Sequence, residues 1–117
     1  MTREAITLDQ QWVPSACTLP TAEQPLRVAE FDALFAEAVR AVRRPDRTRL
    51  LLDLVFAPDN AGRASQLAAR ESGCCSFFSF TLTIADGVMG LEVRVPEQHV
   101  KVLDALQARA EAAAGLT

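Results

Sequence analysis

Two short apolar runs separated by a turn constrain the fold of this chain more than any other feature. In residues 76–84 and 89–95 apolar and polar side chains alternate, and the residues between the runs are Ala-Asp-Gly-Val. Alternation with a period of two is typical of strands with one buried face, and Asp-Gly favours a tight hairpin turn. We therefore expect an antiparallel hairpin. Its inward residues are Phe78, Phe80, Leu82, Ile84, Leu91, Val93 and Val95.

Three other segments have the 3.6-residue spacing of amphipathic helices. The first spans residues 28–43 and ends before Pro45, the second spans about residues 58–72, and the third begins at Pro96. Gly73 follows the second segment directly, and we expect it to end that helix in a left-handed conformation.

A central strand is expected between the first two helices. Residues 49–56 read RLLLDLVF, and alternate positions are apolar. This pattern predicts burial of one face through Leu50, Leu52, Leu54 and Phe56. The element order is then α-β-α-β-β-α, an α+β fold of two layers with an antiparallel-rich sheet and helices on one face. From Arg49 onward the order β-α-β-β-α is partly ferredoxin-like.

The length of the chain suits one domain. Residues 27–117 are expected to form a single α+β domain, since 117 residues are enough for one hydrophobic core. Residues 1–26 contain Pro14, Pro20 and Pro25, which interrupt any helical pattern. We expect this segment to be irregular and to pack on the main body.

Charge and hydropathy exclude several classes of partner. The net charge of −3 and the pI near 5.1 argue against binding of nucleic acid, which needs a basic face. The arginines around Pro45 are interpreted as a solvated helix end. No apolar run is long enough to be a signal peptide or to span a membrane, so we expect the protein to be cytoplasmic. Three cysteines in that compartment indicate free thiols or metal ligands.

Cys74 and Cys75 are the residues that bear most directly on function. Adjacent cysteines in an extended segment point to opposite faces, whereas in a turn after Gly73 both thiols could converge. Free cysteine is also among the most buried residue types, so both could simply fill the core. The functional interpretation is coordination of a soft metal ion by thiolates, with Cys17 as the third donor.

Three thiolates suit a mercuric, cuprous or arsenite species better than zinc. Zinc usually takes four ligands, and the fourth would have to be His99, which is expected to be a solvated surface residue instead. Glu71 and Asp53 are possible supporting carboxylates. Glu71 is more often a solvated helix-end residue in such a position, and Asp53 is ordinary if its face of the sheet is exposed.

The segment ESGCCSFFSF resembles that of a group of small bacterial proteins, common in actinobacteria, that accompany metal-responsive regulators in heavy-metal resistance clusters. The matched residues are Cys17, Glu71, Cys74, Cys75, Phe78 and Phe80. The resemblance spans most of the chain, from ACTLP to the last helix. It implies a role in handling a heavy metal, and it implies no particular activity.

Three hypotheses follow. The leading one is a metal-binding protein for sequestration, delivery or sensing of a soft ion. The second is a thiol enzyme acting on a small organic or organometallic substrate, with Cys75 or Cys74 as nucleophile and Glu71 or Asp53 transferring protons. The third is a structural or dimerisation module, such as a homodimer formed through the alternate face of the sheet. A disulfide between Cys74 and Cys75 ranks last because it is strained.

Overall fold

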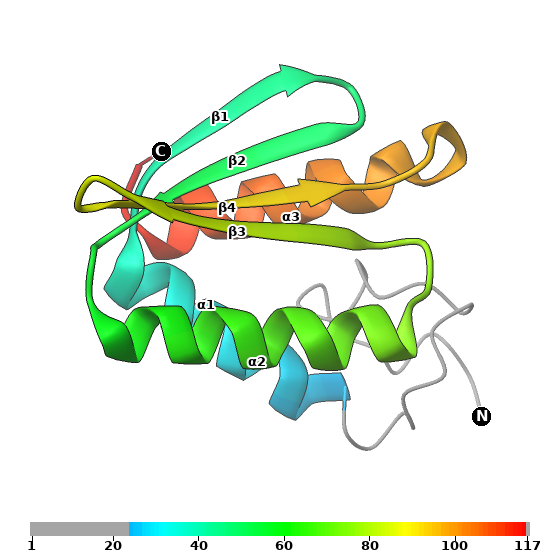
Figure 1. The fold of residues 1–117 in the computed structure, drawn as a ribbon. Helices are drawn as coiled ribbons and strands as arrows, with labels where there is room; N and C mark the ends of the chain where they lie inside the picture. The colour runs from blue at the N-terminus through cyan, green and yellow to red at the C-terminus, as the bar shows by residue number, and fades with distance from the viewer. Residues whose placement is uncertain (1–23, 117) are drawn as a thin grey trace.

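A computed structural model describes residues 24–116 of the chain, except for the side chains of residues 24–27 and Cys74. Its helices and strands form two layers, as Figure 1 shows. In chain order they are α1 (Gln24–Ala38), β1 (Val39–Asp46), β2 (Arg49–Leu54), α2 (Pro58–Cys74), β3 (Ser79–Ala85), β4 (Val88–Arg94), the short 3₁₀ helix η4 (Glu97–His99) and α3 (Val100–Ala113). The predicted α+β class is confirmed, and β1 is an additional strand.

The four strands form one antiparallel sheet in the order β1-β2-β4-β3. Strand β4 lies between β2 and β3, so β2, α2 and β3 form a split β-α-β unit, which is the ferredoxin-like feature of the fold. The central pair is in register from Arg49 opposite Arg94 to Leu54 opposite Met89. This register places the alternating leucines of β2 and the apolar residues of β4 on the same face.

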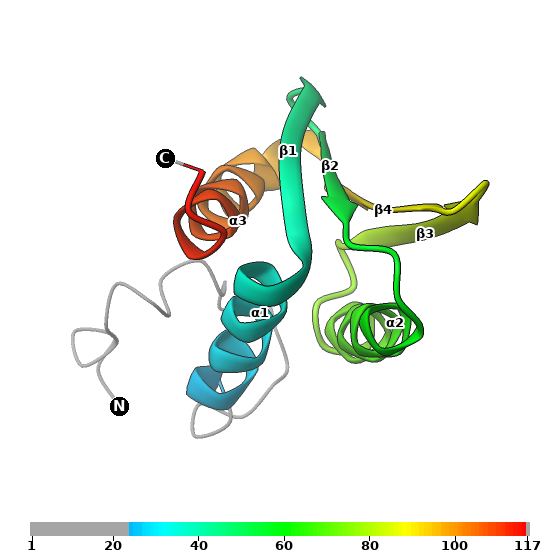
Figure 2. The ribbon, with the colours of Figure 1, turned by 90° about the vertical axis from the view of Figure 1, so that its left-hand side faces the viewer.

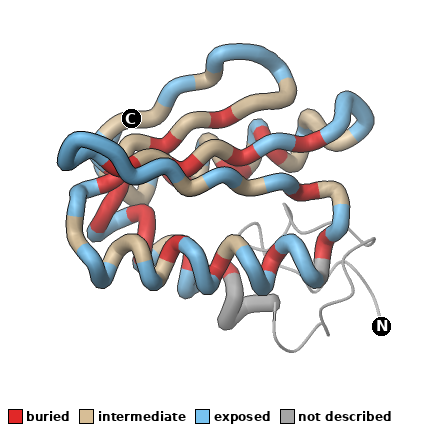
Figure 3. Tube along the Cα trace, viewed as in Figure 1, coloured by how far each residue is buried: buried red, intermediate tan, exposed pale blue. Residues whose placement is uncertain are grey.

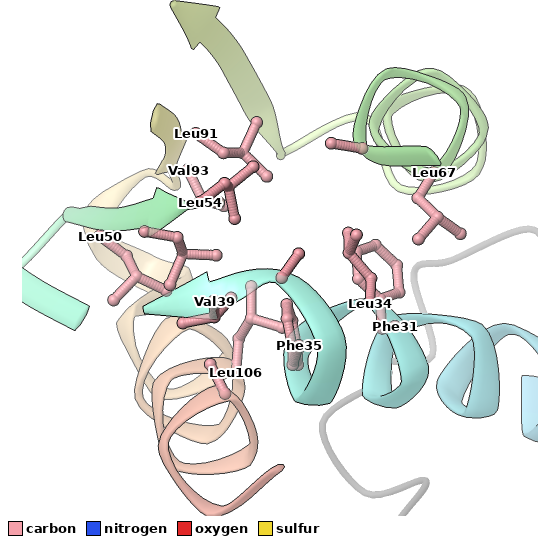
Figure 4. Close-up of a cluster of buried hydrophobic side chains, with 14 of the residues drawn as sticks. Phe31, Leu34, Phe35, Val39, Leu50, Leu54, Leu67, Leu91, Val93 and Leu106 are labelled. Atoms are coloured by element: carbon pink, nitrogen blue, oxygen red, sulfur yellow. The ribbon is translucent and has the colours of Figure 1, made fainter. Parts of the chain in front are cut away.

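All three helices cover that face, and no described helix covers the other one (Figure 2). The core lies between the two layers, and the side chains that meet there come from every helix and from β1, β2 and β4 (Figure 4). The residues labelled there are Phe31, Leu34, Phe35, Val39, Leu50, Leu54, Leu67, Leu91, Val93 and Leu106. Figure 3 shows that buried positions recur along α1, α2, α3, β2 and β4.

The hairpin is confirmed. Asp86 and Gly87 form the two-residue turn between β3 and β4, with φ values of 54° and 71°. Positive φ at both positions is the requirement of a type I′ turn, which matches the twist of the flanking strands. The inner face is also as predicted from Phe78 to Leu82, whereas Ile84 remains 52% exposed because it lies near the end of the hairpin.

The prediction that the first helix spans residues 28–43 was wrong at both ends. The helix begins at Gln24, because proline is tolerated in the first turn, where its missing N–H would have no partner. It ends at Ala38, and residues 39–46 form β1. Pairing with the free edge of β2 satisfies the backbone of this segment, and Pro45 is acceptable there because β1 is an edge strand.

The prediction that the arginines around Pro45 form a solvated helix end was wrong. Two of these arginines instead bond β1 and β2 to neighbouring elements. Arg44 donates to Gln107 of α3 at 2.7 Å and pairs with Asp104 at 2.8 Å. Arg49 donates to Glu92 of β4 at 2.7 Å. These side chains therefore join strand to helix and strand to strand.

Two further predictions were wrong in detail. Phe56 is 53% exposed, because β2 ends at Leu54 and the chain leaves the sheet before it. Gly73 lies inside α2 without a positive φ, and the helix continues to Cys74. Residues 1–23, including Trp12 and Cys17, lie outside the described part. Among residues 24–116 no helix has the length and apolar character needed to cross a membrane.

Substitutions at Gly73 and Gly87 test the backbone conformations seen at these two positions. Replacing Gly73 with alanine should stabilise the protein by about 0.5–1 kcal/mol, because the position is helical and a methyl group meets no atom within 4 Å. Gly87→Ala is the matched control and should destabilise by about 1 kcal/mol, because its φ is left-handed. Urea unfolding measures both. A loss of stability in Gly73→Ala would instead support the left-handed terminator expected from the sequence.

Glu92 should make stability depend on pH in the acid range. The hydrogen bond from Arg49 holds the pKa of Glu92 below its ordinary value of 4.5. A lowered folded-state pKa stabilises the fold above the unfolded value and loses this effect as the pH falls through the folded value. We expect Glu92→Gln to cost about 1 kcal/mol at neutral pH and progressively less below pH 4.5.

Unfolding of Glu92→Gln and wild type in urea, at a series of pH values, checks this expectation. Glu97→Gln is the control, because Glu97 and its partner Arg47 are both largely exposed. A difference between Glu92→Gln and wild type that stays constant down to the acid limit would contradict it.

Candidate functional site

The candidate site is the junction where α2 ends and the chain turns toward β3. Glu71 and Cys75 are four residues apart, so they lie on the same face of the helix end. Both are buried, with exposures of 2% and 0%. The Cys75 sulfur lies 3.1 Å from Oε2 of Glu71. A carboxyl group and a sulfur atom thus touch inside the core.

The backbone around Cys75 is held by hydrogen bonds on both sides. Its N–H donates to the carbonyl oxygen of Glu71 at 2.7 Å, which closes the last turn of α2. Its carbonyl oxygen accepts from the N–H of Phe78 at 3.1 Å. With φ of −121° and ψ of 91°, Cys75 has already left the helical conformation. The sulfur is therefore fixed at the point where helix changes to extended chain.

Cys75 is disulfide-bonded in the structure. The free thiol expected from the sequence is therefore not the state seen. The other two cysteines are Cys17 and Cys74, whose side chains lie outside the described part. A disulfide sulfur has no proton to donate, so the contact with Glu71 is a hydrogen bond only in the reduced form. In that form the thiol donates to the carboxylate.

Ionisation of Cys75 in the reduced site would have an electrostatic cost. If the Cys75 thiol lost its proton beside an ionised Glu71, two negative charges would be in contact in a buried position. Burial of charge is costly, and a cation bound to the thiolate would offset part of that cost.

Helices α1 and α2 run antiparallel beside this site. Arg63 pairs with Glu37 at 2.5 Å, and Arg70 pairs with Glu30 at 2.9 Å. Arg70, near the end of α2, thus pairs with Glu30, which lies nearer the start of α1. The first turn of α1 accordingly lies toward the same end of the molecule as Cys75 (Figure 1).

His99 is half-buried and stacks on Phe77, with ring centroids 4.1 Å apart and an interplanar angle of 18°. The solvated surface histidine expected from the sequence was therefore wrong. Because Phe77 follows Cys75 by two residues, the stack brings the start of the last helix to the same end of the molecule. This neighbour of the site could not be found from the spacing of the sequence.

Asp53 lies on the opposite face of the sheet. Its carboxylate accepts a hydrogen bond from Arg43 at 2.9 Å, and its side chain is 40% exposed. It lines a shallow cavity of 350 Å³ on the face without helices, with Arg43 among the other lining residues. Asp53 is therefore separated from Cys75 by the sheet itself.

No group of three or more histidine, cysteine, aspartate or glutamate side chains is placed to hold a metal ion within the described residues. Cys17 and the side chain of Cys74 fall outside this set. Comparisons of the chain with models of protein families, with curated proteins and with solved structures found no match. The geometry around Cys75 is therefore the basis for any functional proposal.

Glu71 is the residue whose role the sequence understated. A solvated helix-end glutamate was the favoured interpretation, but the side chain is buried. The signal was its spacing, because Glu71 follows Ala64 by seven residues and Leu67 by four, and both of those are core residues of α2. Two helical turns separate residues seven apart, so all three lie on one stripe.

The redox state of Cys75 can be tested by counting thiols. Protein purified without reductant, then denatured and alkylated, should carry one label, since one disulfide takes two of the three cysteines. Peptide mass spectrometry should find Cys75 unlabelled and identify its partner. Protein reduced before denaturation is the control and should carry a label on every cysteine. If the protein purified without reductant carried a label on all three cysteines, the disulfide would be contradicted.

Proposed function

We propose that the reduced chain binds a soft, thiophilic metal or metalloid ion through Cys74 and Cys75, with Cys17 as the third donor. The site would sequester such an ion, deliver it or sense it. The observation that carries the proposal is the buried Cys75 sulfur, which is disulfide-bonded and touches Glu71. A disulfide requires two sulfurs about 2 Å apart, so Cys75 has a second sulfur well within the reach of a shared ion.

The connection to α1 supports Cys17 as a donor. Cys17 precedes the first residue of α1, Gln24, by seven positions. Seven residues reach at most about 25 Å, and α1 starts toward the end of the molecule where Cys75 lies. A short tether of this kind raises the effective concentration of one ligand near another.

Glu71 would have two roles in this site. As the acceptor of the thiol hydrogen bond, it is placed to take the proton that Cys75 must release when a metal binds. As a carboxylate, it could bind the ion through an oxygen or hold the Cys75 ligand in place by contact with its sulfur. Either role couples binding to pH, because protons compete with the metal.

The donor set favours mercuric, cuprous and arsenite species. Thiolates are soft ligands, and three of them match ions that accept trigonal coordination. Zinc would need a fourth ligand, and the only histidine, His99, is at the same end of the molecule. Its ring is already stacked on Phe77 and would have to be reoriented to bind an ion. Zinc is therefore the less favoured ion. A cytoplasmic location fits the proposal, because that compartment keeps thiols reduced.

The burial of Cys75 also supports the structural hypothesis, in which the sulfur fills the core and the disulfide joins two segments. The thiol-enzyme hypothesis has less support. Glu71 is well placed to take the thiol proton, but a sulfur with no exposed surface offers no path to an organic substrate. A metal ion can reach such a sulfur by ligand exchange from a second thiol, and a larger substrate cannot.

Titration of the reduced protein with mercuric, cuprous and arsenite ions tests the proposal. Binding should be tighter than that of a simple dithiol and should weaken in Cys17→Ser, Cys74→Ser and Cys75→Ser. Glu71→Gln should weaken it on the order of 10–100-fold, because the glutamine keeps the shape but not the charge. Competition with a dithiol of known affinity, followed by mass spectrometry, measures the effect.

The matched control is Glu97→Gln, which changes an exposed glutamate and should leave metal binding unaltered. Circular dichroism checks that each variant is folded. Binding no tighter than that of the free dithiol, or equal binding by the wild type and Cys75→Ser, would contradict the metal site and favour the structural role.

A further inference from the structure

The two edges of the sheet differ sharply in how they are protected. Strand β1 carries charged side chains and Pro45, devices by which natural edge strands resist pairing with another sheet. Strand β3, Ser79–Ala85, reads SFTLTIA and has neither a charge nor a proline. In the described part of the chain, β4 is its only strand neighbour. Among residues 24–116, no strand pairs with the outer edge of β3.

The helix-facing side chains of β3 are only partly covered. Phe80 and Leu82 are half-buried, and Ile84 is 52% exposed. They form a row that continues the core to the rim of the sheet. An added strand on this edge would cover that row with its own apolar side chains.

The backbone of β3 is directed for such pairing. Across a two-residue turn, Ala85 and Val88 form a hydrogen-bonded pair, and such pairs alternate along the strands with non-hydrogen-bonded ones. The N–H and C=O groups of Phe80, Leu82 and Ile84 therefore point away from β4. Phe78 follows the same alternation, because its N–H leaves the sheet ladder and donates to Cys75.

The sequence of β3 is self-complementary about Leu82. In an antiparallel pair of two copies centred there, Leu82 faces Leu82 and Phe80 faces Ile84 on the helix side. On the other face Thr81 meets Thr83, and cross-strand threonine pairs are favourable. We propose that a second copy of this chain is the partner, joined by antiparallel β3–β3 pairing into one continuous sheet.

Helix α2 leaves room for this arrangement. Arg63 and Arg70 point toward α1, and Ser72 on the other flank donates to the carbonyl oxygen of Phe78 at 3.5 Å. Ala69 and Ser65 lie on the same flank as Ser72, about one and two turns away respectively, and all three are exposed. A two-fold axis through Leu82 perpendicular to the sheet would bring these small flanks together beneath the joined strands.

Charge reversal at position 83 tests the pairing. Within one subunit Thr81 lies opposite Glu92, so a lysine at position 81 would face an opposite charge. Thr83 lies opposite Gly90, so a charge at position 83 would have no charged cross-strand partner in the same subunit. In the dimer, residue 81 faces residue 83 of the second copy. Thr81→Lys/Thr83→Lys then sets like charges opposite each other, whereas Thr81→Lys/Thr83→Glu sets opposite charges together.

Sedimentation equilibrium of the full chain under reducing conditions gives the result. We expect a wild-type mass of twice 12.7 kDa, a monomer for the double lysine variant and a dimer for the lysine–glutamate variant. A monomeric wild type at its highest soluble concentration would overturn the proposal. So would a dimer that the double lysine variant retains, or equal dissociation of the two variants.

Hydrogen exchange of the wild type provides a second measurement that needs no variant. The amides of Phe80, Leu82 and Ile84 should become protected as the protein concentration rises, while their neighbours Thr81 and Thr83, bonded to β4, stay protected throughout. Fast exchange of the three edge amides in a sample shown to be dimeric would place the interface elsewhere and reject β3 pairing.

Discussion

The pairing of β2 with β4 is the interaction on which the rest of the structure depends. Its register, from Arg49 opposite Arg94 to Leu54 opposite Met89, directs one set of apolar side chains to the helix face. These are Leu50, Leu52, Leu54, Met89, Leu91 and Val93. A shift of one residue would turn them all to the other face, so the packed core strongly specifies this register. Helices α1, α2 and α3 then have a single surface on which to bury their apolar stripes. Because α2 packs on this face, the turn at Cys75 that follows it lies at the edge of the same helix layer.

At that turn a buried acid meets a buried sulfur, and each limits what the other can be. Glu71 is not a solvated residue, and ionisation of Cys75 would place two negative charges in contact. The disulfide resolves this conflict by removing the thiol proton and the charge together. A bound soft cation would resolve it in the reduced form. The same pair of residues therefore suits two chemical states that exclude each other.

The sequence carried enough information for the hairpin, the leucine-rich strand and the helical stripes, because these depend on periodicity within one element. It did not carry β1, because residues 39–46 are a strand only by pairing with β2, and their local pattern also fits a helix. The prediction for Gly73 was wrong because glycine near a helix end often terminates the helix, whereas here its φ is not positive and α2 continues to Cys74. At the site, the spacing of Glu71 already pointed inward, whereas the stack of His99 on Phe77 depends on contacts between distant elements.

The proline and the arginines of β1 have a consequence for assembly size. A sheet with two open edges can add subunits at both sides and grow into a filament, whereas a sheet with one closed edge cannot. If a partner strand pairs with β3, the extended sheet still ends at β1 on the other side of each subunit. A dimer joined through β3 would therefore have an arginine-bearing β1 strand at each outer boundary of its sheet, which disfavours the addition of further copies there.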